Sequence, residues 1–168
     1  MLNPIPSEVD VAVIGAGSAG LPAFRAAREH TDRVILIERG PHGTTCARVG
    51  CMPSKLLIAA AEAAHGMEIA PGFGIHPGSI RIDGEAVMER VRRERDRFVG
   101  FVLDGVDRID PEQKISGQAR FVEDSRLEIG NSQVRAGRVV IASGTSPSIP
   151  DFLEEVPDRV SVNDDVFE

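Results

Sequence analysis

The chain has 168 residues, which is enough for one domain with a sizeable hydrophobic core. Its formal net charge of −7 argues against a nucleic-acid-binding protein. No apolar run is long enough to cross a membrane, and the N-terminal residues lack the basic and apolar regions of a signal peptide, so we expect a cytoplasmic protein that does not act on a membrane.

The first predicted elements form a βαβ unit. The apolar run DVAVI at residues 10–14 indicates a strand, and the glycine-rich sequence GAGSAG at residues 15–20 follows it directly. The alanine-rich segment 21–30 is typical of a helix, and RVILIE at residues 33–38 is typical of a second strand. A dinucleotide-binding fold begins with this order of elements.

Three glycines and a glutamate have separate tasks in such a fold. Gly15 makes the tight turn, Gly17 lets a pyrophosphate approach the backbone, and Gly20 allows helix and strand to pack closely. Glu38, at the end of the second strand, is placed to accept hydrogen bonds from a ribose. These residues predict a site for either FAD or NAD, with a purely structural glycine turn as the alternative.

The only two cysteines, Cys46 and Cys51, lie five positions apart in GTTCARVGCMPSK. At that spacing a regular helix separates two residues by roughly 7.5 Å along its axis, so a disulfide needs a bent connection, which Gly50 tolerates. We expect a helix from Pro53 onward. Cys51 then lies near a helix N-terminus with Lys55 one turn further on, and both features favour a thiolate.

Buried structural cysteines and metal ligands are the alternatives to a redox pair. The histidines lack the paired spacing of a zinc site, so we expect no metal. They are His30, His42, His65 and His76. Spacing alone leaves the choice between structural and redox-active cysteines open.

The remaining segments have weaker patterns. Residues 66–82, with several glycines and prolines, predict a surface connection. Residues 84–106 have helical apolar spacing and arginines interleaved with acids, which favours a solvated helix over a phosphate-binding surface. Short alternating runs within residues 113–142 predict a small antiparallel β-meander that returns to the main sheet. The acidic tail, residues 151–168, is predicted to be a linker.

Together, GAGSAG, Glu38 and GTTCARVGCMPSK resemble the class I FAD-dependent pyridine nucleotide-disulfide oxidoreductases. The sequence VVIASGTSPSIP at residues 139–150 is similar to the strand and turn with which that family leaves its flavin domain. The MPSK ending is most similar to dihydrolipoamide dehydrogenases. Mercuric or glutathione reductases are the alternative, and a non-catalytic nucleotide-binding redox module is a second one.

The resemblance implies an α/β fold. Residues 1–150 are expected to form the N-terminal part of a Rossmann-like FAD-binding domain, with a parallel sheet, a crossover antiparallel β-meander and long helices. The chain would be the N-terminal portion of a homodimeric enzyme and would have little turnover alone. The family's NAD(P)-binding domain, its dimerisation domain and the catalytic histidine of the latter are not recognised in the sequence. His76-Pro77 is followed by Arg81 where the family's acid-base pair has a glutamate, so we interpret His76 as a surface residue.

The resemblance also implies a reaction in which electrons pass between a small dithiol such as dihydrolipoamide, a Cys46–Cys51 disulfide, FAD and NAD(P). Cys51 would face the flavin, Cys46 would exchange with the substrate, and Lys55 would lie near the flavin ring. The implied cofactor-binding residues are Ile14, Gly15, Gly17, Ser18, Ala19, Gly20, Glu38, Arg39, Thr44, Thr45, Gly50, Cys51, Lys55, Ala119, Ala142, Ser143 and Gly144.

Three positions depart from the usual family pattern. Thr44 stands where a second glycine is usual, Arg48 where asparagine is usual, and Ser143 where threonine is usual. None removes a reacting group. Arg48 lies between the two cysteines, where it bears on which disulfide or dithiol is accepted.

Overall fold

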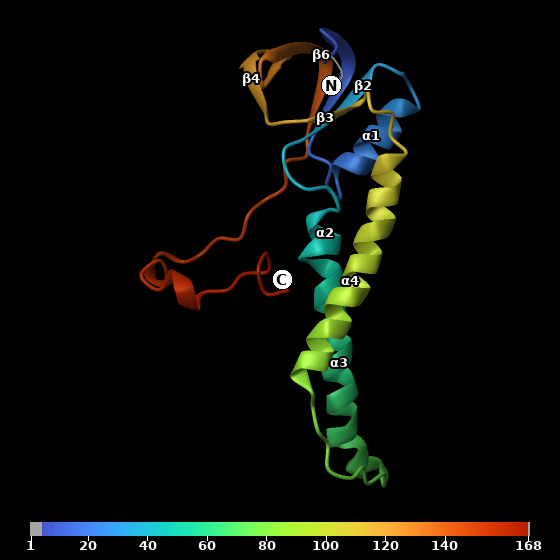
Figure 1. Ribbon diagram of the computed structural model, residues 1–168, viewed down its shortest axis with the longest axis vertical. Coiled ribbons are helices and arrows are strands. Elements are labelled where there is room, and N and C mark those ends of the chain that lie inside the picture. The colour runs from blue at the N-terminus through green and yellow to red at the C-terminus, as the bar shows by residue number, and fades with distance from the viewer. Residues whose placement is uncertain (1–4, 168) are drawn as a thin grey trace. The chain divides into compact units, whose positions relative to one another are not determined.

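A computed structural model describes residues 5–167 of the chain (Figure 1). The chain divides into two compact units. Unit 1 comprises Met1–Thr44 and Phe101–Ser146, and unit 2 comprises Thr45–Gly100 and Pro147–Glu168.

Unit 1 is built on a six-stranded sheet with the order β3-β2-β1-β6-β5-β4. Neighbours among β1, β2, β3 and β6 pair in parallel, whereas β5 is antiparallel to both β4 and β6. The strands are β1 Glu8–Ile14, β2 Val34–Glu38, β3 Lys114–Ser116, β4 Ala119–Glu123, β5 Arg126–Ile129 and β6 Ser132–Ile141.

The second strand is apolar on both faces because both are covered. Residues 34–37 of β2 are all buried, as is typical of a strand inside a parallel sheet. On one face, Val34 and Leu36 pack in a cluster with Phe24 of helix α1, Gly20–Arg28, and with Val106 near the end of helix α4, Gly84–Asp107.

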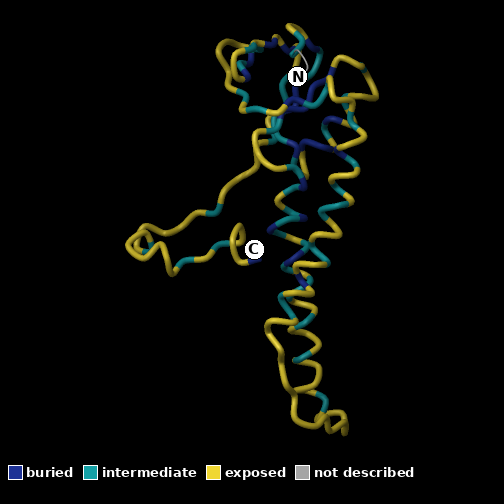
Figure 2. The backbone as a smooth tube through the Cα atoms, in the orientation of Figure 1, coloured by how far each residue is buried: buried dark blue, intermediate teal, exposed yellow. Residues whose placement is uncertain are grey.

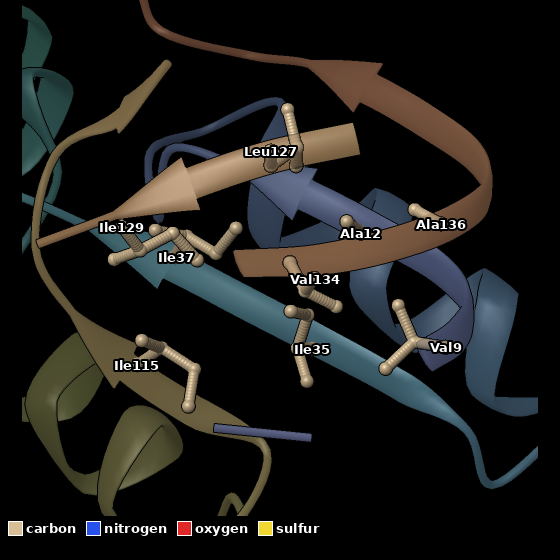
Figure 3. Close-up of a cluster of buried hydrophobic side chains, with 9 residues drawn as sticks. All are labelled: Val9, Ala12, Ile35, Ile37, Ile115, Leu127, Ile129, Val134 and Ala136. Atoms are coloured by element: carbon tan, nitrogen blue, oxygen red, sulfur yellow. The ribbon is translucent and has the colours of Figure 1, made fainter. Parts of the chain in front are cut away.

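Ile35 and Ile37 belong to the cluster on the opposite face, which the meander covers (Figure 3). Its members are Val9, Ala12, Ile35, Ile37, Ile115, Leu127, Ile129, Val134 and Ala136. The parallel strands of unit 1 therefore have helices on one face, while the meander of the same sheet covers the other. The predicted α/β fold with a crossover meander is confirmed.

One part of the predicted meander is wrong. Residues 114–116 form β3, which pairs in parallel with β2 at the edge of the main sheet. Only β4, β5 and β6 make the antiparallel meander. A run of three residues is too short for its pattern of apolar side chains to show which strand it pairs with. The sequence therefore could not distinguish β3 from the strands of the meander that follow it.

Unit 2 consists of helices and short turns. Helix α2 spans Thr45–Arg48, and helix α3 spans Cys51–Ile69, followed by a 3₁₀ turn at Ala70–Phe73. The helix therefore begins two residues before Pro53, and it continues through Gly66, which the sequence placed in a connection. The exposed segment 74–83 then leads into α4 (Figure 2).

The tail of unit 2 is anchored at its end. It contains 3₁₀ turns at Asp151–Leu153 and Pro157–Arg159. Phe167 is only 5% exposed, and its carbonyl oxygen accepts hydrogen bonds from Arg95 (2.9 Å) and Arg92 (3.4 Å) of α4. The predicted linker is thus held against the part of α4 that belongs to unit 2. The predicted domain boundary at residue 150 stays a prediction.

Two kinds of feature are absent from residues 5–167. No helix there combines the length and apolar character needed to span a bilayer. The same residues contain no group of three or more side chains that could hold a metal ion.

Candidate functional site

The loop between β1 and α1 requires glycine at two positions. Gly15 has a φ of +102°, and a Cβ atom there would lie 2.2 Å from the carbonyl oxygen of Ala142. A Cβ atom on Gly20 would lie 1.7 Å from the carbonyl oxygen of Gly15, so the start of α1 is pressed against the end of β1. At Gly17 no atom lies within 4 Å of such a Cβ atom, which leaves the backbone open to a ligand.

Glu38 connects the glycine loop to the end of β2. Its Oε2 atom accepts the N–H of Ala16 at 2.7 Å, and its Oε1 atom accepts the N–H of Gly40 at 2.8 Å. A carboxylate oxygen has more than one lone pair, so both oxygens can still accept hydroxyl groups. The side chain is therefore fixed in place and remains able to bind a ribose.

A cavity of about 420 Å³ lies beside this carboxylate in unit 1. It is lined by Ile14, Gly15, Ile37, Glu38, Arg39, Gly117, Gln118, Ala119, Ser143, Gly144, Thr145 and Ser146. These residues follow or end the four parallel strands, and ligands of open α/β sheets bind at the carboxyl ends of such strands. Its volume is in the range of small-molecule sites.

The cavity brings together seven of the predicted cofactor residues: Ile14, Gly15, Glu38, Arg39, Ala119, Ser143 and Gly144. Other predicted residues of unit 1 do not line it: Gly17, Ser18, Ala19, Gly20, Thr44 and Ala142. Sequence reasoning missed the contribution of Gly117 and Gln118. These two residues directly follow β3, and that position would have placed them at the cavity only if the pairing of β3 with β2 had been known.

The two cysteines lie together in unit 2 because the chain folds back tightly between them. The N–H of Val49 donates to the carbonyl oxygen of Thr45 at 3.0 Å, which closes the single turn of α2. A Cβ atom on Gly50 would lie 3.0 Å from that same oxygen and 3.3 Å from the Cα atom of Cys46. Glycine therefore permits the close approach that brings Cys51 to Cys46.

Cys51 is the first residue of α3, where the helix dipole is positive. Ser54 fixes this first turn, since its N–H (3.2 Å) and its hydroxyl (2.7 Å) both donate to the carbonyl oxygen of Gly50. Cys51 is exposed and Cys46 is half-buried, and both are free thiols. The expected helix-terminal position of Cys51 is thus observed.

The surroundings of Cys46 shift the pKa of its thiol. A hydrogen bond with the Cys51 side chain raises the pKa of Cys46 above its ordinary value, and burial and the charge of Cys51 act in the same direction. A backbone hydrogen bond from Cys51 and the Lys55 ammonium oppose this shift without cancelling it. The structure therefore favours the protonated form of Cys46.

Thr44, just before the cysteine motif, has a φ of +61°. This left-handed conformation is unusual for a residue with a branched side chain. The departure from the usual glycine therefore falls at a position whose backbone conformation favours glycine.

A parallel sheet with a glycine-tight turn, an acidic residue on β2 and a cavity at the strand ends defines a dinucleotide-binding protein. The sequence matches the pyridine nucleotide-disulphide oxidoreductase family over residues 9–166, and the chain belongs to that family. FAD is the cofactor that this family binds, and the cavity and glycine loop suit its adenosine half.

Two curated relatives show how much of a longer protein is covered. A mercuric reductase of Streptomyces lividans is 36% identical over 159 residues, which cover 88% of this chain and 33% of that protein. A glutathione reductase of Burkholderia cepacia is 30% identical, over 96% of this chain and 35% of that protein. The chain thus spans about a third of the length of these relatives.

Among solved structures, the HOCl-induced flavoprotein disulfide reductase RclA from Escherichia coli has a similar fold, with a TM-score of 0.64. It is 21% identical, and the match covers 84% of this chain and 29% of that one. None of these three proteins is named a dihydrolipoamide dehydrogenase. The comparisons therefore favour the alternative reading, a mercuric or glutathione reductase, over the first one.

Proposed function

We propose that this chain forms the FAD-binding and dithiol part of an NAD(P)H-dependent reductase of small disulfides. The observation that carries the proposal is the Cys46–Cys51 pair. Cys46 lies in α2 and Cys51 begins α3, in a chain whose other unit has a dinucleotide-binding fold. When bound, FAD would carry electron pairs between the nicotinamide and the cysteines.

The cysteines would act in sequence. Cys46, once deprotonated, attacks one sulfur atom of the substrate disulfide and releases the other half as a thiol. The Cys51 thiolate then attacks the Cys46 sulfur of the mixed disulfide, releases the second thiol and leaves a Cys46–Cys51 disulfide. Two electrons pass from the dithiol to the substrate, which gains two protons. Because the pKa of Cys46 is raised, its deprotonation would limit the first attack at neutral pH.

The cofactor roles are part of the proposal, and the glycine loop and cavity of unit 1 support them. Gly17 would admit the pyrophosphate, and Glu38 would bind the adenosine ribose. The residues at the strand ends, including Ala119 and Ser143, would surround the adenosine. Lys55 and Thr45 of unit 2 are proposed for the flavin and its phosphates on the family resemblance.

Reduction of mercuric ion is the second candidate, because the Streptomyces lividans relative bears that name at 36% identity. A pair of thiols suits a soft metal ion. The two candidates predict different products. Mercuric ion would form an adduct with Cys46 and Cys51 that NAD(P)H reduces, whereas a disulfide substrate would be released as two thiols.

The test uses the reduced chain and a chromogenic disulfide. The unsubstituted chain should release two thiols per chain, one for each cysteine, and peptide mass spectrometry should find a Cys46–Cys51 disulfide. Cys51→Ser should release one thiol and retain the other half of the reagent on Cys46. Two independent mixed disulfides on the unsubstituted chain, with no internal disulfide, would show that the pair is not a redox dithiol.

A further inference from the structure

Arg48 is a half-buried cation that lies between the two cysteines in the sequence. It is the last residue of α2. Within residues 5–167, its guanidinium makes no hydrogen bond or ion pair. A guanidinium that is still partly exposed and has no protein partner among the described residues is free to pair with an anion from solution, and arginine suits carboxylates because its donors match their two oxygens.

Along the sequence, the charged residues that flank the dithiol all have one sign. Residues 39–61 contain Arg39, Arg48 and Lys55 but no aspartate or glutamate, although the chain as a whole has a net charge of −7. Arg39 lines the cavity of unit 1, and Lys55 acts on Cys46. Arg48, the third cation of this stretch, neither lines the cavity nor shifts the pKa of Cys46.

Arg48 and Lys55 have different relations to the thiols. The Lys55 ammonium lowers the pKa of Cys46, whereas Arg48 is not among the groups that shift it. Arg48 therefore does not set the protonation of this thiol. The carboxylates of a charged disulfide lie several bonds from its sulfur atoms, so a cation set apart from the attacking sulfur suits them.

We propose that Arg48 is a specificity-determining residue that makes the Cys46–Cys51 dithiol prefer disulfides that carry carboxylates. The inference rests on the proposed function and names the substrate class of the same site. Arg48 pairs with a substrate carboxylate and takes no part in the bonds that form and break. The exchange itself is the one given above, with one disulfide reduced to two thiols and one dithiol oxidised.

The experiment compares three disulfide reagents on the reduced 168-residue chain. They are dithiobis(nitrobenzoate), which carries carboxylates, dithiodipyridine, which is neutral, and cystamine, which is cationic. Arg48→Asn introduces the residue that is usual in the family and removes the charge, whereas Arg48→Lys keeps the charge. For Arg48→Asn, we expect the rate ratio of the anionic to the neutral reagent to fall about two- to fivefold, the range of an exposed ion pair.

Four further results are expected. Arg48→Lys should retain most of the preference for the anionic reagent. For Arg48→Asn, the rate ratio of cystamine to the neutral reagent should rise. The matched control is Arg81→Asn in the exposed segment 74–83, which should leave all ratios unchanged. In about 1 M salt, where the screening length is near 3 Å, the unsubstituted chain should behave like Arg48→Asn.

The outcomes separate this inference from the function on which it rests. If the Cys46–Cys51 disulfide forms normally but Arg48→Asn keeps the preference, Arg48 is not the specificity residue. If Arg48→Asn slows all three reagents equally, the residue supports the turn between the cysteines and the inference also fails. If no internal disulfide forms in the unsubstituted chain, the proposed function is overturned together with the inference.

Discussion

The strained backbone at Thr44 allows a prediction whose sign can be tested against the next residue. Thr44 has a φ of +61°, whereas Thr45 begins helix α2. An L-residue in the left-handed region costs roughly 1–2 kcal/mol that glycine does not incur. The greater freedom of glycine in the unfolded chain offsets roughly 0.5–1 kcal/mol of this gain. With the midpoints of these two ranges, Thr44→Gly should be more stable than Thr44→Ala by about 0.75 kcal/mol.

Comparison of two variants at one position removes the contribution of the hydroxyl. Thr44 takes part in other interactions, so the unsubstituted chain is not the proper reference. Alanine and glycine both lack the hydroxyl, and they differ in the cost of a positive φ. The same pair at Thr45 is the control, and there glycine should be less stable than alanine by roughly 0.5 kcal/mol because the residue is helical.

Urea denaturation followed by far-ultraviolet circular dichroism measures both differences. The chain has no tryptophan or tyrosine, so intrinsic fluorescence offers little signal. With equal slopes, the order of transition midpoints gives the order of stability. The reasoning is refuted if Thr44→Ala is as stable as Thr44→Gly, or if the two threonine positions respond with the same sign.

Two further predictions concern the cofactor loop and the thiols. Gly17→Ala should change the free energy of unfolding by no more than about 0.5 kcal/mol but weaken FAD binding in a fluorescence titration. Gly20→Ala should instead destabilise unit 1, because its Cβ atom would lie 1.7 Å from the carbonyl oxygen of Gly15. An unchanged FAD affinity of Gly17→Ala would contradict this difference between the two glycines. Cys51→Ala should move the midpoint of Cys46 alkylation, followed by mass spectrometry, to lower pH, because the hydrogen bond and the charge of the Cys51 side chain, which raise the pKa of Cys46, are lost. A midpoint that stays or rises would show that Cys51 is not the cause.

The parts of the fold that were predictable are those whose signal is local. The βαβ unit follows from strand periodicity and from glycines that the backbone requires at Gly15 and Gly20. The long helix α4 follows from apolar spacing. The pairing of β3 with β2 was not predictable, because three residues contain no information about their neighbour in a sheet.

The candidate site shows the same division. Glu38 and the two cysteines are recognisable because their spacing and their neighbours in sequence mark them. Gln118 enters the cavity only through the topology of the sheet. The hydrogen bond that raises the pKa of Cys46 depends on the close approach at Gly50, which a sequence pattern allows but does not measure. Substrate preference, finally, depends on single side chains such as Arg48, which the family motif does not specify.

The two hydrogen bonds of Glu38 have a further consequence for how a nucleotide would bind. The carboxylate is held at 2.7 Å and 2.8 Å by backbone N–H groups of the glycine loop and of the turn after β2. A free glutamate would lose roughly 0.5–1.5 kcal/mol of side-chain entropy on meeting a ligand. In this chain that loss belongs to folding, so the adenosine end of the site is a preorganised template whose ribose acceptor does not have to be ordered during binding.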